Sequence, residues 1–238
     1  MGRQDINFKD INADKDILIY VHGYNYSFQE SLFQAAKVAS DGKLSEMPIL
    51  FSWPSEGSVT GYVADKDAAT YARDDLVQLL QDLKKRRTKS RVTLFGHSMG
   101  AWLVVEGLRQ LKISGQEDVL QRIDQVVLAA PDIDVDLFKR QVDTIGPLAH
   151  PIIVLNSTDD RALAISGRIG GSRTRLGSID KESVDIQELL ISKKIEIVDL
   201  SNYDPPDKTK HNRFSILINL ISAINNDKMK FIRDIYST

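Results

Sequence analysis

Ser98 is the residue of this sequence with the best setting for nucleophilic chemistry. It lies in Gly96-His97-Ser98-Met99-Gly100, which has the pattern G-x-S-x-G. In this pattern the serine stands on a sharp turn between a strand and a helix, with its hydroxyl exposed and the positive end of the helix dipole behind it. Glycines two residues before and after the serine remove β-carbons that would keep the strand and the helix apart. The pattern therefore predicts covalent catalysis by a serine hydroxyl.

The alternative is an ordinary loop serine, because a chain with 14 glycines can contain these five letters by chance. The flanking residues favour the sharp turn. The segment "RVTLF" (91–95) is typical of a buried strand, and "AWLVVEGLRQL" (101–111) has helical spacing. His97 is expected to point away from its neighbour Ser98, and we interpret it as a support for the turn rather than as the base.

Short branched apolar runs alternate with helical patterns along the whole chain. Continuous apolar strands of this kind are typical of a parallel sheet that is covered on both faces. The expected strands are residues 16–21, 47–52, 91–95, 125–130, 151–156 and 194–200, and the expected helices are residues 27–42, 67–87, 100–112 and 213–225. The alternation predicts a single α/β domain over residues 1–238, with right-handed crossovers.

Composition narrows the classes of partner and cofactor. The net charge of -2 and the pI near 6.1 give no basic field for nucleic acid. The chain has no cysteine, which excludes disulfides, thiolate catalysis and thiolate metal sites. It also lacks metal-binding and nucleotide-binding motifs, so we expect no metal and no cofactor. Without a signal peptide or a transmembrane run we expect a cytoplasmic protein, or an exported one if an N-terminal piece is missing.

Two connections bear on access to Ser98. Residues 166–183 contain four glycines and three arginines, and we expect a solvated loop there or, less readily, a flap over the active-site mouth. The connection between "AAPDID" (129–134) and "PIIVLN" (151–156) is too short, at about twenty residues or fewer, for a cap domain. The sequence thus predicts an open cleft without a separate cap domain, able to take short or medium acyl chains.

Four segments together carry a resemblance to a known family: "VHGYNYSFQESLFQAAKVASD", "FSWPSEGSVTGYVADKDAATYARDDL", "LFGHSMGAWLVVEGLRQL" and "AAPDIDVDLF". The chain resembles, from about residue 16 to about residue 220, the bacterial α/β-hydrolase family catalogued as domain of unknown function 900. The resemblance implies an α/β-hydrolase fold and serine chemistry. It says little about the substrate, because the natural substrates of the family are mostly unassigned.

The base of such a fold follows the serine and the acid along the chain. Of the four histidines, His22 and His97 do not follow Ser98. His150 directly precedes the strand that starts with "PIIVLN", at the wrong end of a parallel sheet whose ligands gather at the carboxyl ends. His211 lies in a polar loop after the last strand, and we predict that it is the base.

The acid has to reach the imidazole from a loop after a later strand. "STDDRAL" and "APDID" both qualify. The family pattern, an acid just before an x-Ala-Leu segment, falls on Asp160. Asp159 is a close rival, Asp132 and Asp134 are more distant ones, and any of these aspartates could instead cap a helix or a turn.

Two backbone N–H groups are the expected donors of an oxyanion hole. In this fold one comes from the residue after the nucleophile, here Met99, and the other from the loop after an early strand. That loop is "VHGYN", in which Gly23 permits the turn that aims the N–H of Tyr24, or less readily that of Asn25.

The leading hypothesis from the sequence is a serine hydrolase that cleaves carboxylic esters through an acyl-enzyme, with Ser98, Asp160 and His211 as its triad. Its expected partner is a small-molecule ester. Amidase, peptidase and thioesterase activities are alternatives of the same chemistry. A hydrolase-fold module that binds a lipid or a protein without catalysis is the alternative from another class.

Overall fold

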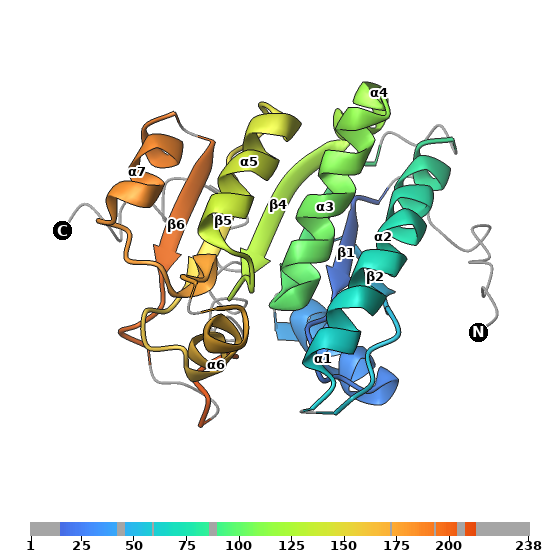
Figure 1. Ribbon diagram of the computed structural model, residues 1–238. Helices are drawn as coiled ribbons and strands as arrows, with labels where there is room; N and C mark the ends of the chain where they lie inside the picture. The colour runs from blue at the N-terminus through green and yellow to red at the C-terminus, as the bar shows by residue number, and fades with distance from the viewer. Residues whose placement is uncertain are drawn as a thin grey trace.

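The structure is a computed structural model that describes residues 15–41, 46–58, 60–85, 90–171, 173–192, 194–203 and 208–212. A six-stranded sheet forms its centre, and every strand pairing in it is parallel (Figure 1). The strands are β1 Ile17–Val21, β2 Met47–Phe51, β3 Val92–His97, β4 Ile123–Ala129, β5 Ile152–Asn156 and β6 Ile195–Asp199. This confirms the predicted parallel sheet and all six predicted strands.

Helices fill the connections between the strands. They are α1 Phe28–Asp41, α2 Tyr62–Lys85, α3 Met99–Ile113, α4 Glu117–Leu120, α5 Val135–Ile145, α6 Arg161–Ile169 and α7 Val184–Ile191, with a 3-10 turn at Leu176–Ser178. The expected helix at 213–225 lies outside the described residues. Among the residues that are described, no helix has both the length and the apolar character to cross a bilayer.

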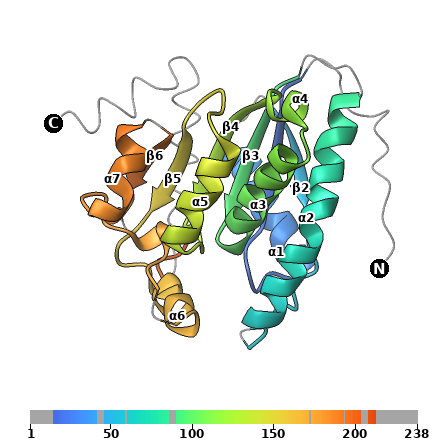
Figure 2. The ribbon, with the colours of Figure 1, turned by 45° about the horizontal axis from the view of Figure 1, so that its top comes forward.

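The two faces of the sheet are covered unequally, as Figures 1 and 2 show. Alternate residues of β1 separate the faces, because successive side chains of a strand point to opposite sides. Ile17 and Ile19 belong to the larger core, which packs under α2, α3, α5 and α7. Leu18 and Tyr20 belong to a smaller core that includes side chains of α1.

The strand order β2-β1-β3-β4-β5-β6 places the site. The chain moves outward from β1 to β2, then returns across β1 to form β3 on its other side. Ligands of open parallel sheets bind at such a reversal, beyond the carboxyl ends of the strands. The segments that follow β1 and β3 meet there: a β-carbon on Gly23 would lie 2.9 Å from the Cβ of Ser98.

The solvated loop predicted at residues 166–183 is present only in part. Residues 166–169 complete α6, and residues 170, 171, 173 and 174 are exposed, as expected for a solvated loop. Arg175 and Leu176, by contrast, are packed into the protein, at 4% and 0% exposed. Backbone hydrogen bonds from Leu176 to Ile133 O (2.8 Å) and from Gly177 to Pro131 O (3.0 Å) hold this segment against the loop after β4. The connection between β4 and β5 contains α5 as its helix and no cap domain.

Candidate active site

The turn that carries Ser98 has the strained backbone of a nucleophile elbow. Ser98 follows β3 directly, and its φ of 53° and ψ of -118° lie in a region that L-residues rarely adopt. Backbone bonds hold it there: its N–H donates to Ala129 O (2.9 Å), and its carbonyl accepts from Ala101 (3.1 Å) and Asp132 (3.2 Å). Its side chain makes no capping hydrogen bond to the first turn of α3, whose residues are all described, so capping does not occupy the hydroxyl.

The glycines of the motif are required by close backbone contacts. A β-carbon on Gly96 would lie 2.6 Å from the Cα of Ala101, and one on Gly100 would lie 2.3 Å from the carbonyl oxygen of His22. Neither neighbour is the end of a flexible side chain. The close approach of strand, turn and helix therefore depends on these two residues being glycine.

We expect Gly100→Ala to destabilise the protein by about 1–3 kcal/mol, because the added methyl group overlaps backbone that cannot move away. Gly107→Ala is the matched control on α3, since its β-carbon would meet the flexible end of the Leu76 side chain at 3.3 Å. There the gain in helix propensity offsets the contact, and we expect a change within about 1 kcal/mol. Urea unfolding of both variants measures this, and equal effects would contradict the steric explanation.

His211 and Asp160 contact each other across 51 positions of the sequence. The Nδ1 of His211 lies 2.7 Å from Oδ2 of Asp160, with the aspartate buried and the imidazole nearly so. The other oxygen of Asp160 accepts the N–H of Leu163 (3.0 Å) and caps α6. Asp160 is thus both a helix cap and the hydrogen-bond partner of the imidazole.

The three rival aspartates have other partners. Asp159 binds Lys210 Nζ (2.6 Å), and Asp134 accepts an N–H from the first turn of α5 (2.9 Å) as its cap. Asp132 is buried and faces the guanidinium of Arg175. Among the hydrogen bonds of the described residues, Asp160 is the carboxylate that reaches the ring of His211.

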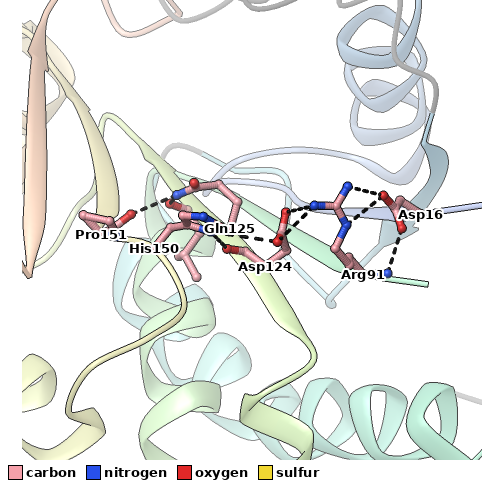
Figure 3. A network of polar contacts seen from close by, with 7 residues as sticks. Asp16, Arg91, Asp124, Gln125, His150 and Pro151 are labelled. Atoms are coloured by element: carbon pink, nitrogen blue, oxygen red, sulfur yellow. Dashed lines mark hydrogen bonds and ion pairs between the residues drawn. The ribbon is translucent and has the colours of Figure 1, made fainter. Parts of the chain in front are cut away.

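His150 lies at the opposite end of the sheet from Ser98, in the polar network of Figure 3. Its Nδ1 lies 2.8 Å from the carbonyl oxygen of Asp124, at the start of β4. Arg91 bridges the carboxylates of Asp16 and Asp124 in the same network. This agrees with the prediction that His150 is not the base.

His97 is a buried support beneath His211. Its ring is 0% exposed, and its centroid lies 4.8 Å from that of the His211 ring. Burial lowers the pKa of His97 well below its ordinary value, and the neighbouring His211 lowers it further. A neutral His97 places no positive charge beside the imidazole of His211.

The stability of the protein should fall below about pH 6.5. Burial also lowers the pKa of His22, so the unfolded chain binds protons at His22 and His97 that the folded protein does not. The free energy of unfolding should therefore decrease as the pH drops below 6.5, by up to about 1.4 kcal/mol per pH unit for each histidine. Urea unfolding at several pH values measures the slope, and His97→Gln should reduce it. A slope unchanged by that substitution would contradict the assignment.

The loop after β1, predicted to supply an oxyanion donor, is fixed by Trp53 beyond the end of β2. The ring of His22 stacks on the indole at 4.9 Å and 5°, its Nε2 accepts the N–H of Trp53 (3.1 Å), and the indole N–H donates to His22 O (2.8 Å). Asn25 adopts a φ of 61°. Met99, the other predicted donor, opens α3, and its N–H is one of the first four that an α-helix cannot satisfy internally.

Asp65 is a site-supporting residue that the sequence analysis did not identify. It lies in the first turn of α2 with 0% exposure. Its carboxylate accepts the Asn25 N–H (3.3 Å), the Ser55 hydroxyl (2.5 Å) and the Glu56 N–H (2.7 Å). It thereby joins the loops that follow β1 and β2. An acid in the first turn of a helix is a common solvent-facing feature, so the sequence offered no signal of this burial.

Asp65→Asn should lower kcat by about 10-fold or more while KM changes little, because it loosens the loop that is predicted to supply an oxyanion donor. Asp67→Asn is the matched control, since it makes the same change at an exposed position of the same helix. Steady-state kinetics on an activated ester measures both variants. Equal kcat values for the two folded variants would show that Asp65 does not affect the loop.

A cavity of about 300 Å³ lies near the amino end of β5, between the end of α5 and Lys194, away from Ser98. Within the described ranges no three histidine or acidic side chains are grouped so that they could hold a metal ion.

The parallel sheet and the strained serine turn at the end of β3 define an α/β-hydrolase fold. The sequence from residue 3 to residue 227 matches the family model described as alpha/beta hydrolase of unknown function, DUF900, and the chain belongs to this family. The family predicted from the sequence is thus confirmed.

The individual proteins to which the chain is similar share little sequence identity with it. An uncharacterized protein of Nostoc, alr1448, is 27% identical over 124 residues, which are 42% of this chain and 32% of that protein. The match thus spans about a third of the length of this relative. TT1662 from Thermus thermophilus is 14% identical, with a TM-score of 0.56 over 90% of this chain and 89% of that one. A proposed carboxylesterase from Lactobacillus plantarum is 13% identical, with a TM-score of 0.51 over 94% and 91%. These structures share the fold.

Proposed function

We propose that the protein is a serine hydrolase that cleaves carboxylic esters, with Ser98 as nucleophile, His211 as general base and Asp160 as the acid that orients the base. The contact of 2.7 Å between His211 Nδ1 and Asp160 Oδ2 carries the proposal. The proposal is also supported by the His211 ring, whose centroid lies 4.8 Å from that of His97, the residue directly before the strained Ser98 turn. A buried carboxylate bound to Nδ1 would fix the tautomer of the imidazole and stabilise its charged form, as in a serine-protease triad.

The proposed reaction begins when His211 removes the proton of the Ser98 hydroxyl as it attacks the ester carbonyl. The backbone N–H groups of Met99 and Tyr24 stabilise the oxyanion of the tetrahedral intermediate. Tyr24 is favoured over Asn25 for this role, because the Asn25 N–H donates to Asp65. His211 then protonates the leaving alcohol, and Asp160 stabilises the charged imidazolium in the meantime.

Water completes the cycle by hydrolysing the acyl-enzyme with His211 again as base. Esters are proposed rather than amides because an alcohol leaves more readily than an amine. The proposed carboxylesterase of the same fold is consistent with this choice. Amidase, peptidase and thioesterase activities would share the first steps, and a comparison of matched esters, thioesters and amides of one acyl group separates them.

Labelling with a fluorophosphonate probe tests the proposal. The probe reacts with an activated serine and not with an ordinary one, so we expect one adduct, located at Ser98 by peptide mapping. p-Nitrophenyl esters of increasing acyl length should then be hydrolysed, with short and medium chains preferred, because α5 adds no cap over the site. A folded protein that neither reacts with the probe nor hydrolyses any ester would instead favour the non-catalytic binding module.

A further inference from the structure

Asp132 connects the nucleophile turn to three other parts of the protein. Its backbone N–H donates to the carbonyl of Ser98 (3.2 Å). Its buried carboxylate accepts the hydroxyl of Tyr62 (2.8 Å) and that of Ser166 (2.8 Å), and it lies 3.2 Å from Nε of Arg175. These partners come from α2, from α6 and from the segment that precedes the 3-10 turn.

Helix α6 is the element for which these contacts matter most, because Asp160 is its N-cap. The helix has nine residues, and its buried residues are Leu163, Ser166 and Gly167, while Ile165 and Ile169 are more than half exposed. So little apolar burial gives the helix a weak hold on the rest of the protein. The position of the candidate acid therefore depends on the polar contacts of α6.

Two of those contacts are made by Ser166. Its hydroxyl donates to the carboxylate of Asp132, and its carbonyl accepts Nη2 of Arg175 (3.0 Å). Arg175 is itself 4% exposed and pairs with Asp132. Burial, together with the charge of Asp132, raises the pKa of Tyr62 well above its ordinary value, so the phenol remains a hydrogen-bond donor.

We propose that Asp132 is a positioning residue. It fixes α6 relative to the Ser98 turn and thereby keeps Asp160 and His211 at the correct distance from Ser98. This inference rests on the proposed function. Asp132 is not the acid in this account, because both of its oxygens already bind buried partners. A buried ion pair adds little net stability compared with apolar side chains of similar size, which suits a role in geometry rather than in stability.

Three variants test the inference. Asp132→Asn should lower kcat by about 100-fold, and Ser166→Ala by about 10-fold, with KM within about 2-fold of wild type, because a displacement of about 1 Å in a catalytic group can cost about 100-fold. The double variant D132N/R175M removes both buried charges. It should unfold at a higher temperature than Asp132→Asn alone, yet its kcat should remain low.

A second readout does not depend on turnover. If His211 donates from Nδ1 to Asp160, as proposed, this proton should give a low-field NMR resonance, and the resonance should weaken or shift in Asp132→Asn and Ser166→Ala. If wild type reacts with no probe and no ester, the proposed function fails, while this resonance still shows whether Asp132 holds the pair together. Glu106→Gln is the control, since Glu106 makes a buried contact of 2.6 Å with Gln141 between α3 and α5. It should lower stability without moving the resonance or kcat.

Two results would overturn the inference. The first is that Asp132→Asn and Ser166→Ala both fold and keep the wild-type kcat and an unchanged resonance. The contacts of Asp132 would then contribute to packing alone and not to the position of Asp160. The second is that Asp132→Asn is as inactive as Ser98→Ala while Asp160→Asn remains active. Asp132 would then be the acid of the triad. If Asp132→Asn does not fold, Ser166→Ala decides alone, because it removes one hydroxyl and leaves both charges paired.

Discussion

Ser98→Ala should lower kcat by about 10⁶-fold and abolish labelling by a fluorophosphonate. The expected size follows from serine proteases, where loss of the nucleophile removes nearly the whole contribution of the triad. The fold should survive, because the Ser98 side chain makes no capping bond to the described first turn of α3, and alanine can be held in the turn by the same backbone hydrogen bonds. Initial rates on an activated ester, with circular dichroism to check the fold, measure the effect.

Ser114→Ala is the matched control for this experiment. It makes the same change on the same helix, at the C-terminal end, where the hydroxyl donates to the carbonyl of Gln110. Its kcat should equal that of wild type. A Ser98→Ala variant that keeps most of the activity would show that another group is the nucleophile. A small residual rate is expected, because the oxyanion donors still act on the bound ester.

The sheet could be predicted from the sequence because each strand is a short, largely apolar run, and β1, β3, β4 and β5 are largely buried on both faces. β1 and β5 were predicted within one residue at each end, and β4 within two. This signal is local, since it needs no knowledge of which segments pair. The strand order is non-local and was not predicted, although it brings the segments after β1 and β3 together.

The short helices α5 and α6 could not be predicted in the same way. They have eleven and nine residues, and each begins directly after an aspartate that caps it, Asp134 for α5 and Asp160 for α6. Each cap lies in a polar segment that is equally typical of a turn. The burial of Arg175 within residues 166–183 was missed for a similar reason, because Arg175 pairs with Asp132 in a contact between two loops that no local pattern reports.

Within the candidate site, the position of Ser98 followed from local spacing alone. His211 followed from chain order and from the end of the sheet at which ligands bind. The choice between Asp159 and Asp160 depended on the family resemblance. The two carboxylates are adjacent in one loop and have nearly the same sequence context, and the directions in which they point cannot be read from the sequence. In the structure Asp160 points to His211 and Asp159 to Lys210, which gives a geometric basis for the prediction without testing its catalytic role.

Asp160→Asn should lower kcat by about 10⁴-fold with the fold intact. An asparagine amide at this position would stabilise the wrong tautomer of the His211 imidazole, so the ring could no longer accept the proton of Ser98, as in a serine-protease triad. Stability should change little, because asparagine caps a helix about as well as aspartate and can still accept the N–H of Leu163. Steady-state kinetics and urea unfolding of the same preparation measure the two effects separately.

Asp159→Asn is the control that makes this test specific, because it changes the neighbouring residue in the same way. It weakens the half-exposed ion pair with Lys210, which should cost at most about 1 kcal/mol of stability and far less turnover than Asp160→Asn. The assignment of the acid would be wrong if Asp132→Asn or Asp134→Asn abolished activity while Asp160→Asn stayed near wild type. A residue of the triad should approach the rate of Ser98→Ala, whereas a residue that merely caps a helix should lose about 1 kcal/mol of stability and keep its turnover.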